Sequence, residues 1–330
     1  MRIISVNPYV IRGAHPSSST QDPNWGYSCL VRIETDTGLV GWGEGTTDLG
    51  WGAPKLLERI NTMFAPTLIG RDPTEPMAIW KDLQTLSVSN YGRELWTSDE
   101  QQTSIGAISA IDIALWDITG NAKGQPICKQ LSSAIRSHIK VCVEVSLDDL
   151  WVQQFSSDSP WQLASATIPE AQSLLDLGFD TFQVKIEGRP ESDMQVVRAT
   201  REAFGRHASI VVENYNLNAP GEELVWAMSS ARISLFVEAF KPHSKDNLRP
   251  SVPVAWGENE WDGKKLCEGM AGGGVDILRP NIIICGGFTA LLRIMIIAKS
   301  HDVLVMPSCS SLHGSGIALA AIIQASAAVP

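Results

Sequence analysis

The strongest constraint on the fold is a regular alternation of short apolar runs and helical stretches in the last two thirds of the chain. Amphipathic stretches such as 168–177, 190–204 and 287–300 separate apolar runs of the length and composition of buried strands. These runs lie at 139–145, 181–186, 209–214, 234–239, 253–258, 275–279 and 303–307. Repeated strand–helix units predict a parallel sheet, and so many in one domain favour closure into a TIM-like barrel.

The first third of the chain has a different pattern. Residues 2–12 and 27–34 are rich in Val, Ile and Tyr, and a third predicted strand ends at the sequence Gly41-Trp42-Gly43-Glu44-Gly45. Apolar residues then recur at helical spacing, as in Ile108, Ile111, Leu115 and Ile118. We therefore predict an α+β domain over residues 1–124 that caps a barrel domain over residues 125–330.

Composition limits the partners that this chain can bind. With 44% hydrophobic and 19% charged residues, the 330-residue chain has the balance of a globular protein with a large core. The net charge of -10 argues against a broad basic surface for nucleic acid or for anionic membrane lipid. A small molecule is the expected partner.

The cysteines and the N-terminus bear on the compartment. The six cysteines form no CxxC pair, which indicates buried thiols in a reducing environment. The chain has neither the apolar core of a signal peptide after Met1 nor an apolar stretch of about 20 residues that could span a bilayer. A cytoplasmic location is the prediction.

Polar side chains follow the predicted strands at the edge where TIM barrels place their active sites. In chain order these residues are Lys185, Glu213 with Asn214, Glu238, Glu258, Asn281 and Ser308. An acid or an amide occurs at each position from the third strand to the sixth. One strand end offers two candidates, and because successive side chains of a strand face opposite ways, only one of Glu213 and Asn214 can point inward.

These residues, with four further motifs, resemble the mandelate racemase branch of the enolase superfamily. The motifs are Gly41-Trp42-Gly43-Glu44, the run Ala110-Ile111-Asp112-Ile113-Ala114-Leu115-Trp116-Asp117, and Gly257-Glu258-Asn259, followed by Gly286-Gly287 after the sixth strand. The resemblance extends over nearly the whole chain. It implies a (β/α)7β barrel with an N-terminal cap. Compared with the family pattern, the sequence is expected to stop before an eighth strand and a C-terminal segment.

The resemblance also implies a cofactor and a set of ligands. Family members bind Mg²⁺ through acidic residues that end strands three, four and five, and these positions correspond here to Asn214, Glu238 and Glu258. Glu213 is the alternative third ligand if the register differs by one residue. Lys185 occupies the position of the family's lysine base.

Other positions depart from the family pattern. Gln183 replaces the first lysine of a Lys-x-Lys pair, and Ser308 and Asn281 occupy the positions of a histidine base and the aspartate that orients it. Three further residues are candidates for substrate contact: His313 beyond the seventh strand, Asn216 beyond the third, and Trp25 in the polar 14–26 loop.

The resemblance thus implies abstraction of the proton next to a substrate carboxylate, with dehydration of a sugar acid as the predicted reaction. With one lysine and no histidine partner, elimination is easier to support than racemisation, which generally needs a proton donor on each face of the carbanion. A racemase or epimerase is one alternative, and a degenerate barrel that binds a ligand or partner without turnover is the other. Assembly into dimers or octamers is a further implication.

Overall fold

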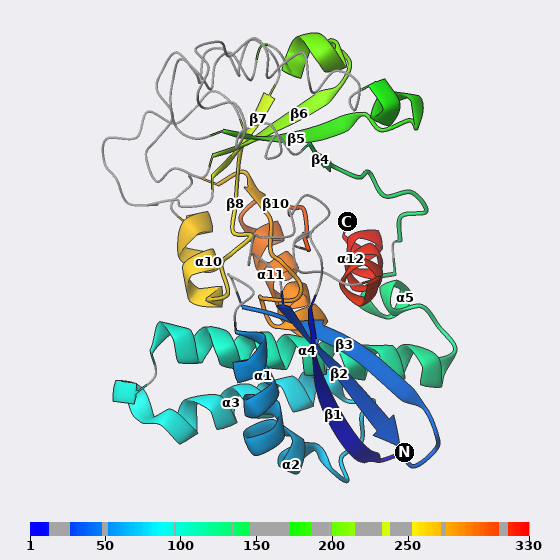
Figure 1. Cartoon of the computed structure of the whole chain (residues 1–330), viewed down its shortest axis with the longest axis vertical. Coiled ribbons are helices and arrows are strands. Elements are labelled where there is room, and N and C mark those ends of the chain that lie inside the picture. The colour runs from blue at the N-terminus through cyan, green and yellow to red at the C-terminus, as the bar shows by residue number, and fades with distance from the viewer. Residues whose placement is uncertain are drawn as a thin grey trace.

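The computed structural model describes residues 1–12, 27–47, 52–95, 97–133, 135–145, 172–186, 198, 200–214, 233–237, 253–271, 275–309 and 316–329. These residues form a stack of three tiers (Figure 1). A small antiparallel sheet with its helices lies at one end, helices that include those of the C-terminal part of the chain occupy the middle, and the larger part of a parallel sheet lies at the other end.

The N-terminal tier has the predicted α+β content. Its strands β1 (Ile3–Arg12), β2 (Tyr27–Thr35) and β3 (Val40–Gly45) pair antiparallel in the order β1-β2-β3. The helices that follow are α1 (Ala53–Arg59), the π-helical turn η1 (Ile60–Phe64), α2 (Ala65–Leu68), α3 (Pro76–Leu95), α4 (Ser98–Lys123) and α5 (Ile127–Leu131). Helix α4 ends at Gly124, whose φ of 58° is the left-handed conformation that favours glycine at a helix end.

Strand β3 packs directly on the backbone of α4. Its glycines alternate along the strand at positions 41, 43 and 45, so they share one face. A β-carbon added at Gly41, Gly43 or Gly45 would lie 2.1, 1.8 and 2.1 Å from the carbonyl oxygens of Ala114, Ala110 and Gly106. These helix residues are four apart and therefore form one ridge of α4. No larger residue fits between strand and helix, which explains the glycine spacing.

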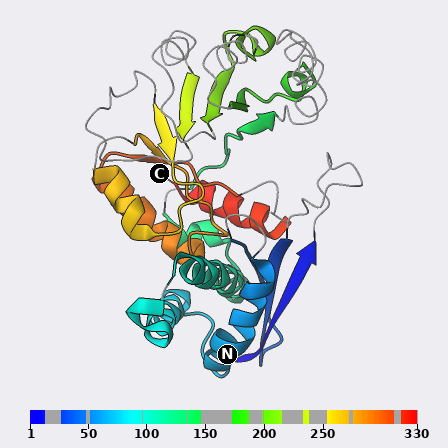
Figure 2. The ribbon, with the colours of Figure 1, turned by 60° about the vertical axis from the view of Figure 1, so that its left-hand side comes forward.

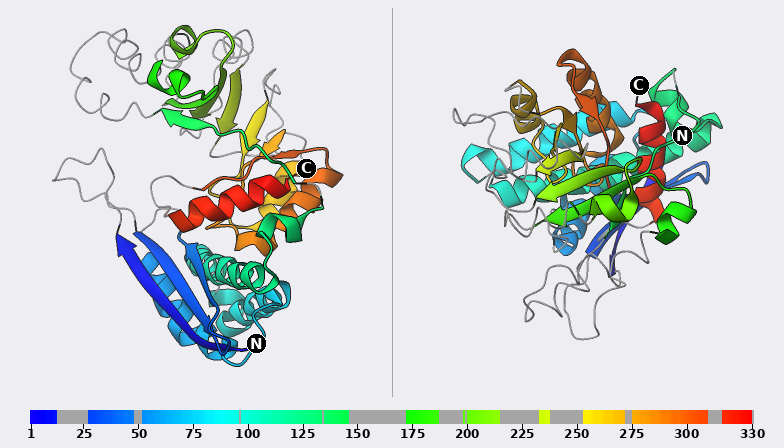
Figure 3. Two further views of the ribbon diagram at one scale, coloured as in Figure 1. Left: turned by 90° about the vertical axis from the view of Figure 1, so that its right-hand side faces the viewer. Right: turned by 90° about the horizontal axis from the view of Figure 1, so that it is seen from above.

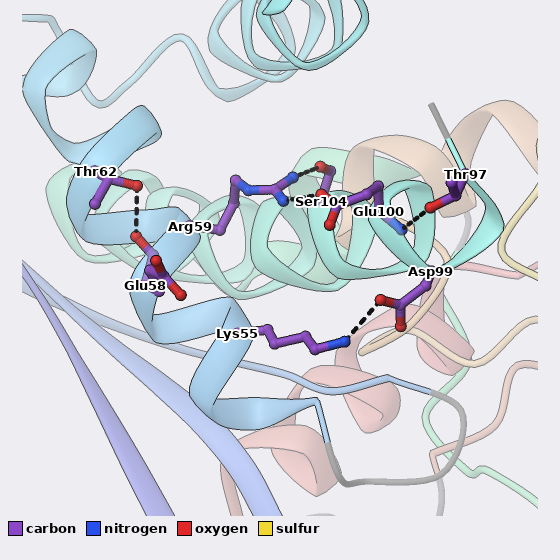
Figure 4. Close-up of polar contacts among 8 residues, drawn as sticks. All are labelled: Lys55, Glu58, Arg59, Thr62, Thr97, Asp99, Glu100 and Ser104. Atoms are coloured by element: carbon purple, nitrogen blue, oxygen red, sulfur yellow. Dashed lines mark hydrogen bonds and ion pairs between the residues drawn. The ribbon is translucent and has the colours of Figure 1, made fainter. Parts of the chain in front are cut away.

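Polar contacts fix α1 against the first turns of α4 (Figure 4). Thr97 caps α4 by accepting a hydrogen bond from the Glu100 backbone N–H at 3.3 Å. The buried Arg59 side chain binds both Glu100 and Ser104, and the exposed pair of Lys55 and Asp99 lies 2.7 Å apart. The buried Arg59 contacts matter more for stability than the solvent-exposed pair, which is screened by water.

The parallel sheet contains a strand at each of the predicted positions. In sequence these are β4 (Val143–Val145), β5 (Thr181–Ile186), β6 (Ser209–Asn214), β7 (Ile233–Val237), β8 (Val254–Trp256), β9 (Ile277–Leu278) and β10 (Leu304–Val305). They pair in the order β10-β9-β8-β7-β6-β5-β4, with β10 and β4 at the two edges of the described sheet. The helices α10 (Gly263–Ala271), α11 (Gly287–Ser300) and α12 (Gly316–Ala328) follow β8, β9 and β10.

The two faces of this sheet have different environments. Phe182, Val184 and Val212 pack with Phe204 and other residues of the flanking helical segments. The alternate positions meet across the opposite face, where Val211 of β6 and Ala255 of β8 pack with Cys142 and Ile277. Side chains of strands that are not neighbours thus converge on one concave face, which is the interior of a curved sheet.

The N-terminal tier lies against the helices of the middle tier (Figure 2 and Figure 3), and buried hydrogen bonds join the two. The Asp112 carboxylate of α4 accepts bonds from the backbone N–H and the hydroxyl of Thr289, at 2.9 and 2.6 Å, in the first turn of α11. Glu44 of β3 accepts a bond from the backbone N–H of Ala318, at 3.0 Å, in the first turn of α12. Both carboxylates satisfy helix N–H groups that have no partner within their own helices.

Within the part of the chain that the structure describes, no helix combines the length and apolarity needed to cross a bilayer. The proposed division at residues 124 and 125 stays a prediction.

Candidate active site

Four polar side chains form a hydrogen-bonded chain across the interior face of the parallel sheet. Glu213 and Gln183 are each 5% exposed and Arg279 is 7% exposed, so three of the four lie in the core. The Gln183 amide donates from Nε2 to Glu213 Oε2 at 2.6 Å and accepts at Oε1 from Arg279 Nη1 at 2.9 Å. Arg279 Nη2 lies 3.1 Å from Glu258 Oε2. We call these four residues the interior chain.

The interior chain connects strands that are far apart in the sheet order. Gln183 lies on β5 and Arg279 directly follows β9, with β8, β7 and β6 between them. In a flat sheet these two strands would be about 19 Å apart, at about 4.8 Å per strand. A hydrogen bond of 2.9 Å between their side chains requires the sheet to curve around this point. The curvature therefore places Glu213 and Glu258 at the two ends of one chain of side chains, with Gln183 and Arg279 between them.

Glu258 occupies the outer end of the interior chain. It follows β8 after Gly257, whose φ of 103° is accessible to glycine and turns the backbone at the strand end. The Glu258 side chain is 16% exposed, whereas the Arg279 side chain is 9% exposed. One carboxylate oxygen binds the guanidinium, and the residue keeps contact with solvent. Glu258 is thus the member of the chain that a ligand entering from solvent reaches first.

Cys309, which the sequence analysis did not single out as a site residue, lies close enough to Glu44 and Glu258 for their charges to act on its thiol. Burial raises the pKa of its thiol to about 11, with smaller contributions from the charges of Glu44 and Glu258. A thiol with this pKa stays protonated at neutral pH and is neither a nucleophile nor a ready metal ligand. Its effect at the site is that of a small neutral group.

The backbone places two further predicted residues beside the interior chain. Lys185 is the register partner of Glu213 in the pairing of β5 with β6, two residues beyond Gln183 on the same strand. Asn214 is the last residue of β6. Of the two adjacent candidates on β6, the side chain that the structure describes is that of Glu213, and it faces the interior through Gln183.

Asn281 and Ser308 lie next to each other at the ends of β9 and β10. An isolated parallel bridge pairs the two residues. Asn281 is fully buried and its amide oxygen accepts a bond from the Ile283 backbone N–H at 3.2 Å. The Ser308 hydroxyl donates to the Arg279 carbonyl at 3.4 Å, which is long for such a bond. Neither side chain can act as an acid or base near neutral pH.

The remaining predicted site residues lie outside the described residues. They are Glu238, Asn216, His313 and Trp25. Among the described side chains, no three His, Cys, Asp or Glu residues are arranged to hold a metal ion.

Arg279 was not among the predicted site residues. Its signal in the sequence is a cation at the end of an apolar run, in Ile277-Leu278-Arg279-Pro280, where a charge needs a buried partner. Two other acids of the motifs, Glu44 and Asp112, bind the N-termini of α12 and α11, so the motifs that carry them have a structural role.

Comparison with known proteins places this site in a family. Residues 17–131 match the family described as mandelate racemase/muconate lactonizing enzyme, N-terminal domain, and residues 166–330, half of the chain, match the family described as enolase C-terminal domain-like. A D-galactarolactone cycloisomerase from Agrobacterium fabrum is 29% identical over 308 residues, covering 91% of this chain and 75% of that protein. A D-galactonate dehydratase from Pectobacterium atrosepticum is 28% identical over 326 residues, covering 92% and 78%.

Solved structures agree on the fold. A racemase from Streptomyces coelicolor A3(2) with bound magnesium superimposes with a TM-score of 0.77 at 20% identity, covering 99% of this chain and 87% of that one. At this identity the likeness concerns the fold, an α/β TIM barrel with an N-terminal cap. The N-terminal match, the C-terminal match and this fold lead to one conclusion: the chain belongs to the mandelate racemase/muconate lactonizing enzyme family of the enolase superfamily.

Proposed function

We propose that this protein is a Mg²⁺-dependent enzyme that removes the proton next to the carboxylate of a sugar acid and eliminates water. The observation that supports this most is the convergence of Glu213 and Glu258 on one interior, with Lys185 paired in register with Glu213. Relatives at 28% and 29% identity are a sugar-acid dehydratase and a sugar-lactone cycloisomerase.

The donors present fit Mg²⁺ in their chemistry. Glu213 and Glu258 offer carboxylate oxygens, the hard ligands that this ion prefers, and no thiolate competes because the Cys309 thiol has a raised pKa. We propose Glu238, Glu258 and one of the two residues that end β6 as the metal ligands. The interior position of Glu213 favours Glu213 over Asn214. When bound, Mg²⁺ would act as a Lewis acid on the substrate carboxylate and make the neighbouring proton more acidic.

Lys185 is the proposed base in its neutral form. A lysine beside a cation and partly removed from water loses stability as an ammonium, which favours the amine that accepts a proton. Gln183, two residues earlier on β5, is occupied at both ends of its amide by Glu213 and Arg279. It therefore holds the acids in place and transfers no proton.

Dehydration is favoured over racemisation by the residues opposite the lysine. A racemase needs a second proton donor on the other face of the carbanion. Asn281 and Ser308 occupy the positions from which the resemblance expects such a donor, and the Asn281 amide oxygen already binds the backbone. A one-base elimination needs no group there.

Exchange of the α-proton in D₂O tests the proposal directly. The protein, with Mg²⁺, is incubated with D-galactonate and a panel of related acid sugars, and deuterium incorporation and loss of water are followed by NMR and mass spectrometry. We expect exchange or dehydration of at least one acid, at least about 10²-fold slower in Lys185→Ala because a positioned base contributes that much.

Lys140→Ala is the matched control. Lys140 is an exposed lysine that pairs with Asp180 at 3.0 Å, so its loss should leave the rate unchanged. Mg²⁺ titration by calorimetry provides the second readout. Failure of the wild-type protein to bind Mg²⁺ at millimolar concentration would contradict the proposal, as would an unchanged rate in Lys185→Ala. Assembly as a dimer or octamer, and a cytoplasmic location, stay predictions.

A further inference from the structure

We infer that Arg279 is a built-in counter-cation: when no metal ion is bound it offsets one of the two negative charges of the interior acids Glu213 and Glu258, and in doing so it weakens the binding of Mg²⁺. The inference rests on the proposed function, because it concerns the same acids. It assigns a role to a residue that touches them but that the proposed reaction does not use.

Burial of the acids creates the need for such a cation. Glu213 is 5% exposed and the Glu258 side chain is 16% exposed, so both lose most of their hydration on folding. An uncompensated buried carboxylate costs several kcal/mol, and two near each other also repel. The folded protein without metal therefore needs a positive charge within the interior chain.

Arg279 is positioned to supply that charge to both acids. It contacts Glu258 directly at 3.1 Å and reaches Glu213 through one neutral amide, that of Gln183. The amide has one orientation that satisfies both neighbours, with its oxygen toward the guanidinium and its nitrogen toward the carboxylate. The Arg279 guanidinium can only donate, so it fixes the orientation of the Gln183 amide and with it the direction of the hydrogen bond to Glu213.

Arg279 differs from Lys185 in keeping its charge through the proposed reaction. A lysine that accepts the substrate proton begins as a neutral amine, so it offers no charge to the acids at that point. A guanidinium keeps its charge at every working pH. The division of tasks is a permanent cation at Arg279 and a proton acceptor at Lys185.

The same charge opposes a divalent ion at the site. Mg²⁺ bound by Glu258 would lie close to the guanidinium that contacts the same carboxylate, and like charges repel strongly where solvent is scarce. Arg279 therefore stabilises the metal-free protein more than the metal-bound protein. Removal of Arg279 should make the stability of the fold more dependent on bound Mg²⁺, and it should raise the affinity of the site for Mg²⁺.

Thermal unfolding with EDTA or with saturating Mg²⁺ tests the inference on three variants. Arg279→Met removes the charge and keeps an apolar stem, and Arg279→Lys keeps the charge. Arg201→Met is the control, because Arg201 is a second partly buried arginine that binds the carbonyls of Gly205 and Ala208, away from the interior acids. Calorimetry gives the Mg²⁺ affinity of each variant.

For Arg279→Met we expect a lower Tm in EDTA and a Mg²⁺-induced rise in Tm about twice that of the wild type, with about tenfold tighter Mg²⁺ binding. Arg279→Lys should respond to Mg²⁺ as the wild type does. Arg201→Met should lower Tm equally with and without Mg²⁺.

Two results separate the failure of this inference from that of the proposed function. A wild-type protein that does not respond to Mg²⁺ overturns both. If the wild type responds but Arg279→Met shows the same or a smaller response, the counter-cation role is wrong and the metal site stands.

Discussion

At the scale of single residues, the two interior acids are held by different kinds of partner. Glu213 receives a hydrogen bond from a neutral amide, whereas Glu258 contacts a guanidinium and retains some exposure to solvent. A ligand can approach Glu258 from solvent without disturbing the amide, whereas Gln183 already binds one oxygen of the more deeply buried Glu213. The two residues should therefore respond differently to substitution.

Substitutions at the end of β6 identify the third ligand. If Glu213 binds the metal, Glu213→Gln lowers Mg²⁺ affinity by about tenfold or more, because the charge of a carboxylate ligand is lost. Asn214→Ala then changes the affinity little. The measurement is calorimetric titration, with Glu268→Gln as control, since Glu268 is a half-exposed residue of α10 paired with Lys264. The opposite ranking would assign the position to Asn214.

Asp112 is expected to make stability depend on pH. Burial raises the pKa of this carboxyl to about 7, partly offset by its bonds from Thr289 and Phe288. Because the folded state binds the proton more tightly than the unfolded state, the stabilisation is complete below the unfolded pKa and is lost as pH rises through about 7. Between pH 6 and pH 8 the loss should be about 1 kcal/mol.

Urea unfolding at several pH values measures this dependence. Asp112→Asn removes the titrating group and should flatten the curve between pH 6 and pH 8. Asp82→Asn is the control, since Asp82 is an exposed residue that pairs with Arg71 at 2.7 Å. A curve of unchanged slope in Asp112→Asn would exclude Asp112 as its origin.

The sequence predicted part of the site for a clear reason. Acids that end apolar strands are conspicuous, so Glu213 and Glu258 were recognised as rim residues. Arg279 was missed because its partners, Gln183 and Glu258, come from strands that only curvature brings together. A contact between β5 and β9 has no local signature in the sequence. All the predicted site residues, Glu213 and Glu258 as well as Lys185, Asn214 and Glu238, stay predictions in that role.

At the scale of elements, β3 packs directly against the backbone of α4. Three glycines, at every second position of the strand, contact the carbonyls of three helix residues that are four positions apart. The two-residue repeat of the strand thus matches the four-residue spacing along one face of the helix. This contact keeps the strand that carries Glu44 at a fixed height above α4. It thereby sets the position from which Glu44 reaches α12.

Gly43→Ala should be strongly destabilising. The added β-carbon would lie 1.8 Å from the Ala110 carbonyl oxygen, and backbone cannot yield as a flexible side chain can. We expect a loss of about 3 kcal/mol or more in the free energy of unfolding, measured by urea denaturation. Gly263→Ala, at a glycine with open space around it, should change stability by less than about 0.5 kcal/mol. Equal effects of the two substitutions would contradict the steric explanation.

The elements of the parallel sheet were predictable because each buried strand is a separate apolar run. Their lengths were not: β9 and β10 are two residues each, shorter than the predicted 275–279 and 303–307. The residues beyond them leave the ladder to form the Asn281–Ser308 bridge and the bonds around it. Such departures depend on tertiary contacts that strand propensity does not record.

At the scale of the whole molecule, the cap and the parallel-sheet domain share a buried and polar boundary. Asp112, Glu44 and Trp116 each reach across it, the last by donating to the Thr289 hydroxyl at 3.0 Å. Separation of the two parts would break these bonds, each of which contributes a net stabilisation of about 0.5–3 kcal/mol. The cap should therefore stay attached while a substrate enters.

Hydrogen exchange measures this coupling. Peptides from α4 and from α11 should exchange with the same free energy of opening, because the two helices unfold together. In Trp116→Phe, which removes one bond across the boundary, both should lose protection by the same amount. Lasting protection of α4 while α11 exchanges freely would show that the two parts open independently.

The first turns of α11 and α12 complete their hydrogen bonding with carboxylates that belong to the cap. Neither part of the chain therefore encodes everything that its own helices require. If recombination replaced the cap alone, α11 and α12 would lose the carboxylates that accept their N-terminal hydrogen bonds. A substitution at Glu44 would likewise be selected for its effect on a helix that begins more than 270 residues later. The two parts are thus constrained to be inherited and to diverge together.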